Sequence, residues 1–136
     1  MSRVIIADDH LMFNECLQMV LGKHNYEVVG VALDGVEAVR LALERRPHMI
    51  LLDVNMPKMD GYTFIRELRA QGSEAAQAPV MMVSTESRSH DASRAFAAGS
   101  NCYLVKPAGP SALVLTAALL LGDAQAANKA ARGMNA

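Results

Sequence analysis

Residues 48–61 read HMILLDVNMPKMDG, an apolar run that ends at a carboxylate and continues into turn-forming residues. The four apolar residues 49–52 are typical of a short strand that is covered on both faces, as in the middle of a parallel sheet. Asp53 follows directly, at a place where removing a charge from water is costly. Asp53 either begins a turn, as aspartate commonly does, or supplies a charge that is needed at this strand end.

Apolar strand-like runs alternate with helical patterns along the chain. Strands are expected at residues 4–7, 28–32, 49–52, 80–83 and 102–105. Helices are expected after residue 9, after residue 34, at residues 62–70, at residues 91–98, and from Pro110 onward. This alternation implies right-handed crossovers and an open parallel sheet with helices on both faces. The sequence therefore predicts an α/β fold.

The first two helices have predicted buried faces. Asp34 resembles an N-cap, and Glu37 completes a box-like signature three residues later. The expected buried residues are Phe13, Cys16, Leu17, Val20 and Leu21 in the first helix, and Val36, Val39, Ala42 and Leu43 in the second. Cys16 and Cys102 lack metal-ligand spacing and are interpreted as buried free thiols.

Length and charge limit the functional classes. The chain has 136 residues and a net charge of −1, which fits one domain and gives no strong field toward nucleic acid or an anionic membrane. The apolar start is too short for a signal peptide or a spanning helix, so a cytoplasmic location is expected. Residues 1–122 form the predicted domain, and the Ala-rich residues 123–136 extend the last helix or form a disordered tail, with no output domain.

Polar groups follow four of the five predicted strands. They are Asp8 and Asp9 after the first strand, Asp53 after the third, Ser84 and Thr85 after the fourth, and Lys106 after the fifth. In a parallel sheet these ends lie along one edge, and ligands bind where the strand order reverses. With the order 2-1-3-4-5, the three carboxylates would converge there, while Ser84 and Lys106 reach in from beyond the third strand.

Three converging carboxylates require a cation. Mg²⁺ is the expected ion, with Mn²⁺ as an alternative, because hard divalent cations prefer oxygen ligands. Lys106 and Ser84 add a positive charge and a hydroxyl donor, which suit a phosphoryl group. A carboxylate can itself be the nucleophile and form an acyl phosphate, so Asp53 is the candidate phosphoacceptor.

In their order, these motifs resemble the receiver domain of two-component response regulators over about residues 3–122. The resemblance includes the Asn55-Met56-Pro57 and Asp60-Gly61 loop and the Lys106-Pro107 pair. It implies a flavodoxin-like (βα)5 three-layer sandwich with a five-stranded parallel sheet in the order 2-1-3-4-5. It also implies phosphorylation by a histidine kinase or a histidine phosphotransfer protein.

The resemblance assigns a role to each site residue. Asp53 would accept the phosphoryl group, and the metal would be bound by Asp8, Asp9, Asp53 and the backbone carbonyl of Asn55. Phosphoryl oxygens would be contacted by Ser84, the Thr85 backbone N–H and Lys106. The switch would be formed by Ser84 and Tyr103, self-dephosphorylation would be tuned by Asn55 and Glu86, and Pro107 would follow a cis peptide bond. Tyr103 is interpreted equally well as a core residue. Ala108 departs from the aromatic that often follows Lys-Pro in the family.

The output face is implied by the same resemblance. Family members usually act through the fourth helix, fifth strand and fifth helix, and residues 111–122 carry more apolar side chains than one helix face needs. We therefore expect docking of a downstream protein or self-association into a homodimer on this face. His10, His24, His48 and His90 show no ligand spacing and are interpreted as surface or capping residues.

The sequence thus predicts a chemotaxis-type single-domain phosphoprotein that switches protein interactions and is not an enzyme with a separate substrate. One alternative is a Mg²⁺-dependent phosphohydrolase with an aspartyl-phosphate intermediate, but its second catalytic aspartate would stand where Asn55 does. Another alternative is a flavin-binding module, but Asp8-Asp9 replaces the expected Ser/Thr-rich phosphate loop. A degenerate receiver used only as an interaction platform is disfavoured by the intact Asp53, Ser84 and Lys106.

Overall fold

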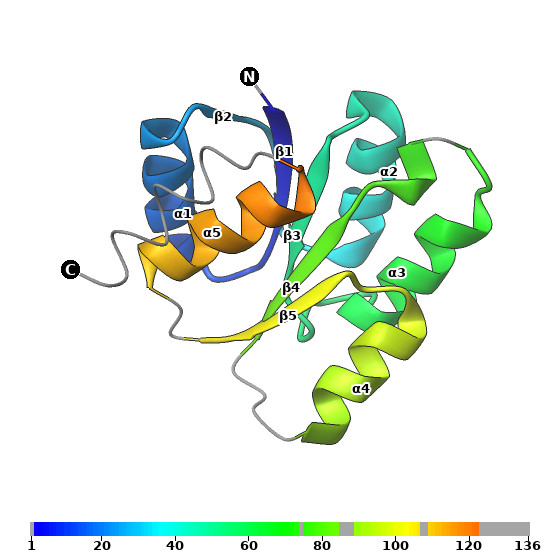
Figure 1. Ribbon diagram of the computed structural model, residues 1–136. Coiled ribbons are helices and arrows are strands. Elements are labelled where there is room, and N and C mark those ends of the chain that lie inside the picture. The colour runs from blue at the N-terminus through cyan, green and yellow to red at the C-terminus, as the bar shows by residue number, and fades with distance from the viewer. Residues whose placement is uncertain (1, 74, 85–88, 107–108, 123–136) are drawn as a thin grey trace.

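The computed structural model describes residues 2–73, 75–84, 89–106 and 109–122, and the strands in this part of the chain form one parallel sheet (Figure 1). The strands are β1 Ser2–Ala7, β2 Tyr26–Ala32, β3 Met49–Leu52, β4 Val80–Ser84 and β5 Cys102–Val105. Their order is β2-β1-β3-β4-β5. The predicted flavodoxin-like order is therefore confirmed. Thr85, Glu86, Pro107, Ala108 and residues 123–136 lie outside the described residues.

Helices cover both faces of this sheet. They are α1 Leu11–Lys23, α2 Gly35–Arg45, α3 Gly61–Ala70, α4 Ser89–Ala98 and α5 Pro110–Leu120, with a short 3-10 helix, η1 Ala75–Gln77. Figure 1 shows α1 and α5 on one face and α2, α3 and α4 on the other. No helix in the described residues is long and apolar enough to cross a membrane.

Alternating strand side chains build a separate core on each face of the sheet. Ile5 and Leu52 belong to the core that includes residues of α2, α3 and α4. Ile6 and Leu51, their neighbours in sequence, belong to the core with residues of α1 and α5. This follows from the two-residue period of a strand. The middle strand β3 is consequently apolar throughout, as the run before Asp53 predicted.

Two Asp-Gly pairs fix the starts of α2 and α3. Asp34 accepts a hydrogen bond from the backbone N–H of Glu37 at 2.9 Å, so the predicted N-cap is confirmed. Asp60 accepts one from the N–H of Thr63 at 2.8 Å. A Cβ on Gly61 would lie 2.5 Å from the carbonyl oxygen of Asp53, closer than real Cβ atoms come. The start of α3 is thus packed directly against the backbone of the candidate phosphoacceptor.

Some of the predicted helix faces are wrong. Cys16 is exposed and Cys102 is only partly buried, so neither is the expected buried thiol, although burial does raise the pKa of Cys102. In α2 the prediction is confirmed for Ala42, and Val39 and Leu43 pack partly buried against the core, but Val36 is 54% exposed. The other buried residues of α2 are Gly35, Ala38 and Leu41. In α1 the buried residues are Asn14, Leu17 and Leu21. Each residue along a helix turns the side chain by about 100°. When a helix has more apolar residues than one face needs, the sequence does not determine which face is buried.

Arg69 ties α3 to two other segments. Its guanidinium donates hydrogen bonds to the carbonyl oxygens of Ala76 at 2.9 Å, Ala78 at 2.6 Å and Gly99 at 3.1 Å, and to Asn101 Oδ1 at 3.1 Å. Burial lowers the pKa of this guanidinium. Removal of the Arg69 guanidinium would leave these part-buried acceptors without a charged donor, and this would lower the stability of the fold.

We expect Arg69→Met to lower the free energy of unfolding by about 2–4 kcal/mol, because hydrogen bonds to a charged donor are lost together. Urea denaturation followed by circular dichroism measures this change. Arg66→Met is the matched control, since Arg66 is an exposed arginine on the same helix. Equal stability of the two variants would contradict the proposed structural role of Arg69.

Candidate functional site

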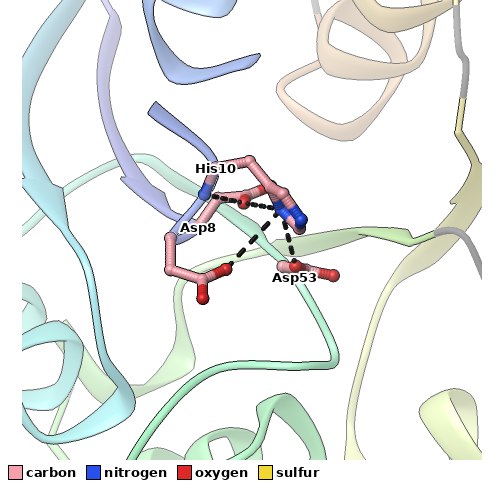
Figure 2. A group of neighbouring side chains, drawn as sticks. Asp8, His10 and Asp53 are labelled. Atoms are coloured by element: carbon pink, nitrogen blue, oxygen red, sulfur yellow. Dashed lines mark hydrogen bonds and ion pairs between the residues drawn. The ribbon is translucent and has the colours of Figure 1, made fainter. Parts of the chain in front are cut away.

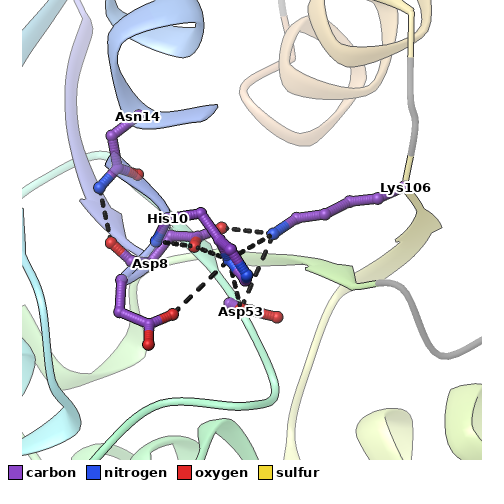
Figure 3. Close-up of polar contacts among 6 residues, drawn as sticks. Asp8, His10, Asn14, Asp53 and Lys106 are labelled. Carbon is purple, nitrogen blue, oxygen red and sulfur yellow. Dashed lines mark hydrogen bonds and ion pairs between the residues drawn. The ribbon is translucent and has the colours of Figure 1, made fainter. Parts of the chain in front are cut away.

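The carboxyl ends of β1, β3 and β5 bring two carboxylates and an ammonium group together. Asp8 follows β1, Asp53 follows β3 and Lys106 follows β5. Lys106 Nζ lies 2.7 Å from Asp8 Oδ2 and 3.7 Å from Asp53 Oδ2 (Figure 3). The convergence that the sequence predicted is therefore present in the fold.

Asp8 is held by hydrogen bonds on both sides. Its Oδ1 accepts a bond from the backbone N–H of His10 at 2.9 Å, and its Oδ2 accepts one from Lys106. Its carbonyl oxygen accepts a bond from Asn14 Nδ2 at 2.6 Å. Because Asn14 and His10 lie at the start of α1, this helix fixes the orientation of the Asp8 carboxylate.

Asp53 is buried with one carboxylate oxygen unsatisfied. Its side chain is 3% exposed, and within the described residues Oδ2 has no hydrogen-bond partner. Burial raises the pKa of Asp53, and repulsion from Asp8 adds to this effect. Lys106, the backbone N–H of Asn55 and His10 oppose it. The ionised form of Asp53 is thus disfavoured until a further positive charge enters the site.

Lys106 is fixed in place by its surroundings. Its side chain is 10% exposed. Nζ lies 4.3 Å from the centre of the Phe13 ring, a cation–π contact. The ammonium group is therefore placed against Asp8 and is also within reach of Asp53.

His10 and Asn14 are site residues that the sequence reasoning missed. His10 was interpreted as a surface or capping residue, and its side chain is indeed 58% exposed, but its Nδ1 faces the carboxylates. The available signal was its position directly after Asp8-Asp9. Asn14 is a buried amide on an otherwise apolar helix face, and that position was the only signal for it in the sequence.

The other predicted residues lie around this cluster. Asp9 is more exposed, and its Oδ1 lies 3.6 Å from His10 Nδ1. Ser84 is fully buried at the end of β4. Asn55 is exposed in the loop after β3, and Tyr103 packs against the core of α2, α3 and α4. Thr85, Glu86 and Pro107 were also predicted for the site and fall outside the described residues.

The donor set fits a divalent cation. Asp8, Asp9, His10 and Asp53 each offer one ligand atom, and these atoms all lie within 4.8 Å of one another. The unsatisfied Asp53 Oδ2 and the repulsion between Asp8 and Asp53 are what such an ion would relieve. The carboxylates suit Mg²⁺, which usually takes one or two of them together with waters and phosphate oxygens.

Curated bacterial proteins have sequences similar to this chain. The chain is similar to the transcriptional regulatory protein PdtaR of Mycobacterium tuberculosis, with 37% identity over 112 residues that cover 82% of this chain and 53% of PdtaR. It is similar to PrrA of Mycobacterium bovis, with 39% identity over 105 residues that cover 77% of this chain and 43% of PrrA. The chain thus spans about half the length of these curated relatives.

Solved structures match the fold over most of both chains. The chemotaxis protein CheY4 of Vibrio cholerae has a TM-score of 0.82 and 33% identity, covering 89% of this chain and 99% of CheY4. The receiver domain of sensor histidine kinase PA1611 from Pseudomonas aeruginosa, with a magnesium ion coordinated in its active site cleft, has a TM-score of 0.81 and 28% identity, covering 89% and 98%. Residues 4–118 match the model of the response regulator receiver domain, so the chain belongs to this family of two-component signalling proteins.

Proposed function

We propose that this receiver domain is phosphorylated on Asp53 by a histidine kinase or histidine phosphotransfer protein with Mg²⁺, and that it acts as a phosphorylation-controlled switch of protein interactions. The observation that carries the proposal is the buried Oδ2 of Asp53, which has no hydrogen-bond partner among the described residues and lies 3.7 Å from the Lys106 ammonium. Family membership and the acidic cluster support it.

In this reaction the Asp53 carboxylate is the nucleophile. One of its oxygens forms the new O–P bond, the P–N bond to the donor histidine breaks, and its electron pair returns to the imidazole. Lys106 orients Asp8 and offers its ammonium group to a phosphoryl oxygen, while Ser84 is assigned a hydrogen bond to another. Asp8, Asp9, Asp53 and the Asn55 carbonyl would hold Mg²⁺, which supplies positive charge to the carboxylates and phosphoryl oxygens when bound.

The switch would pass from the site to the surface of α4, β5 and α5. Ser84 moves toward the phosphoryl group in this proposal, and Tyr103 reorients with it. Exposed apolar side chains on this face, Phe96, Val105 and Leu119, support the docking of a downstream protein or a second copy. Much of the apolar excess in residues 111–122 consists of side chains that are buried within the domain, namely Leu113, Val114, Ala117 and Ala118.

Labelling with acetyl phosphate and Mg²⁺, followed by intact-mass measurement, tests the proposal. We expect one phosphoryl adduct in the wild-type protein and none in Asp53→Ala or after EDTA treatment. Asp60→Asn is the matched control, because it removes a carboxylate outside the cluster and keeps a residue that can cap α3. An adduct that persists in Asp53→Ala, or steady phosphoester turnover without an adduct, would contradict the proposed switch and favour a different phosphoacceptor or a hydrolase.

A further inference from the structure

We propose that His10 is a ligand of the metal ion, so that the site takes an imidazole-preferring divalent transition ion, such as Co²⁺ or Zn²⁺, in addition to Mg²⁺. The inference rests on the proposed function, since the ion occupies the same acidic cluster. Figure 2 shows the His10 ring joined by dashed lines to Asp8 and Asp53; its Nδ1 lies 2.8 Å from Asp8 Oδ1 and 3.5 Å from Asp53 Oδ2. The same nitrogen lies 3.6 Å from Asp9 Oδ1.

One bound ion is compatible with these three distances together. Ligand atoms about 2.1 Å from an ion are separated by about 3.0 Å in an octahedral shell and about 3.4 Å in a tetrahedral one. The observed distances from His10 Nδ1 to the three carboxylate oxygens are 2.8, 3.5 and 3.6 Å, one below and two above these values. A hydrogen bond explains the contact with Asp8, whereas the two longer distances are ion-pair distances if the ring is protonated, and Lys106 Nζ lies 3.5 Å from the same nitrogen. A bound ion would take the place of that ring proton.

The unsatisfied oxygen of Asp53 is an independent sign of a missing ligand. Oδ2 is the atom nearest to His10 Nδ1 on that residue, it is buried, and it accepts no hydrogen bond in the described part of the chain. A buried carboxylate oxygen without a donor is costly. An ion bound beside His10 Nδ1 would satisfy this oxygen.

An imidazole in the ligand set changes which ions the site favours. Mg²⁺ is hard and takes oxygen ligands, whereas Co²⁺ and Zn²⁺ accept neutral imidazole readily. Nδ1 can ligate when the ring proton is on Nε2, and the 58% exposure of the side chain lets water solvate that N–H. His10 therefore raises affinity for transition ions more than affinity for Mg²⁺.

The test compares Co²⁺ with Mg²⁺ binding in the full chain. Co²⁺ alone is titrated and followed by its visible absorption, and Mg²⁺ affinity is measured by competition with Co²⁺. We expect His10→Asn to lower the ratio of Co²⁺ to Mg²⁺ association constants about tenfold or more and to shift the Co²⁺ absorption. Asparagine keeps an N–H donor that can reach Asp8, so a merely structural role of His10 would leave the ratio unchanged.

Two further variants complete the design. His10→Phe removes both the ligand and the hydrogen bond, and we expect the same fall in the ratio as with His10→Asn. His24→Asn removes an exposed histidine at the other end of α1 and should keep the wild-type ratio.

A wild-type ratio and absorption spectrum in His10→Asn would overturn the inference, while Mg²⁺ binding and the acetyl phosphate adduct would leave the proposed function standing. A His10-dependent Co²⁺ spectrum without any adduct on Asp53 would support the ligand role and overturn the proposed function instead.

Discussion

Lys106→Met is expected to lower the free energy of unfolding in EDTA by about 3 kcal/mol at neutral pH, because it leaves buried carboxylates without their cation. Asp8 and Asp53 are 4% and 3% exposed in their side chains, and both lie within 3.7 Å of Lys106 Nζ. Methionine fills much of the same space beside Phe13 but carries no charge. Guanidinium denaturation in EDTA measures the loss.

Saturating Mg²⁺ should restore part of this stability, and by more than it stabilises the wild-type protein, because the ion replaces the lost positive charge. Lys58→Met is the control, since Lys58 is an exposed lysine 3.5 Å from Asp34 and such surface pairs contribute about 0–1 kcal/mol. A Lys106→Met variant as stable as Lys58→Met in EDTA would show that Lys106 does not compensate the two carboxylates.

Asp53→Asn is expected to act in the opposite direction and to raise the free energy of unfolding in EDTA at pH 7. Burial and repulsion from Asp8 outweigh the attraction of Lys106, so the ionised carboxylate is a net cost in the metal-free protein. The variant removes that cost and keeps the shape of the side chain. It should also lose the phosphoryl adduct.

The pH dependence provides a second measurement of this effect. The pKa of Asp53 is 3.8 in its ordinary state and is raised in the folded protein, so between these two pKa values the folded state binds more protons than the unfolded chain. Its contribution to stability is therefore lost as the pH rises through that window. This loss should be missing in Asp53→Asn, and a variant less stable than wild type in EDTA at pH 7 would contradict the prediction.

Given the strand order that the family resemblance implied, the meeting of Asp8, Asp53 and Lys106 was predictable from the sequence for a physical reason. In a parallel sheet, the residue after each strand lies at the same edge whatever its side chain is, so polar residues at strand ends are sufficient to place the cluster. The roles of Ser84, Asn55 and Tyr103 depend on a bound phosphoryl group or metal ion and stay predictions.

His10 and the helix faces could not be predicted in the same way. A histidine between a strand and a helix reads as a cap until its ring orientation is known, and the contact of its Nδ1 with Asp8 defines that orientation. Asn14 was hidden because its partner is a backbone carbonyl, which no sequence pattern marks. Cys16 and Val36 show that apolar residues identify the buried face of a helix only when the other faces carry polar residues.

The guanidinium of Arg69 constrains how α4 can move. It binds Gly99 and Asn101, directly after the last residue of α4, and holds them against α3. If α4 were displaced, it would therefore rotate about this anchored carboxyl end. Ala92 would therefore be displaced further than Phe96, which lies one turn closer to the anchored end.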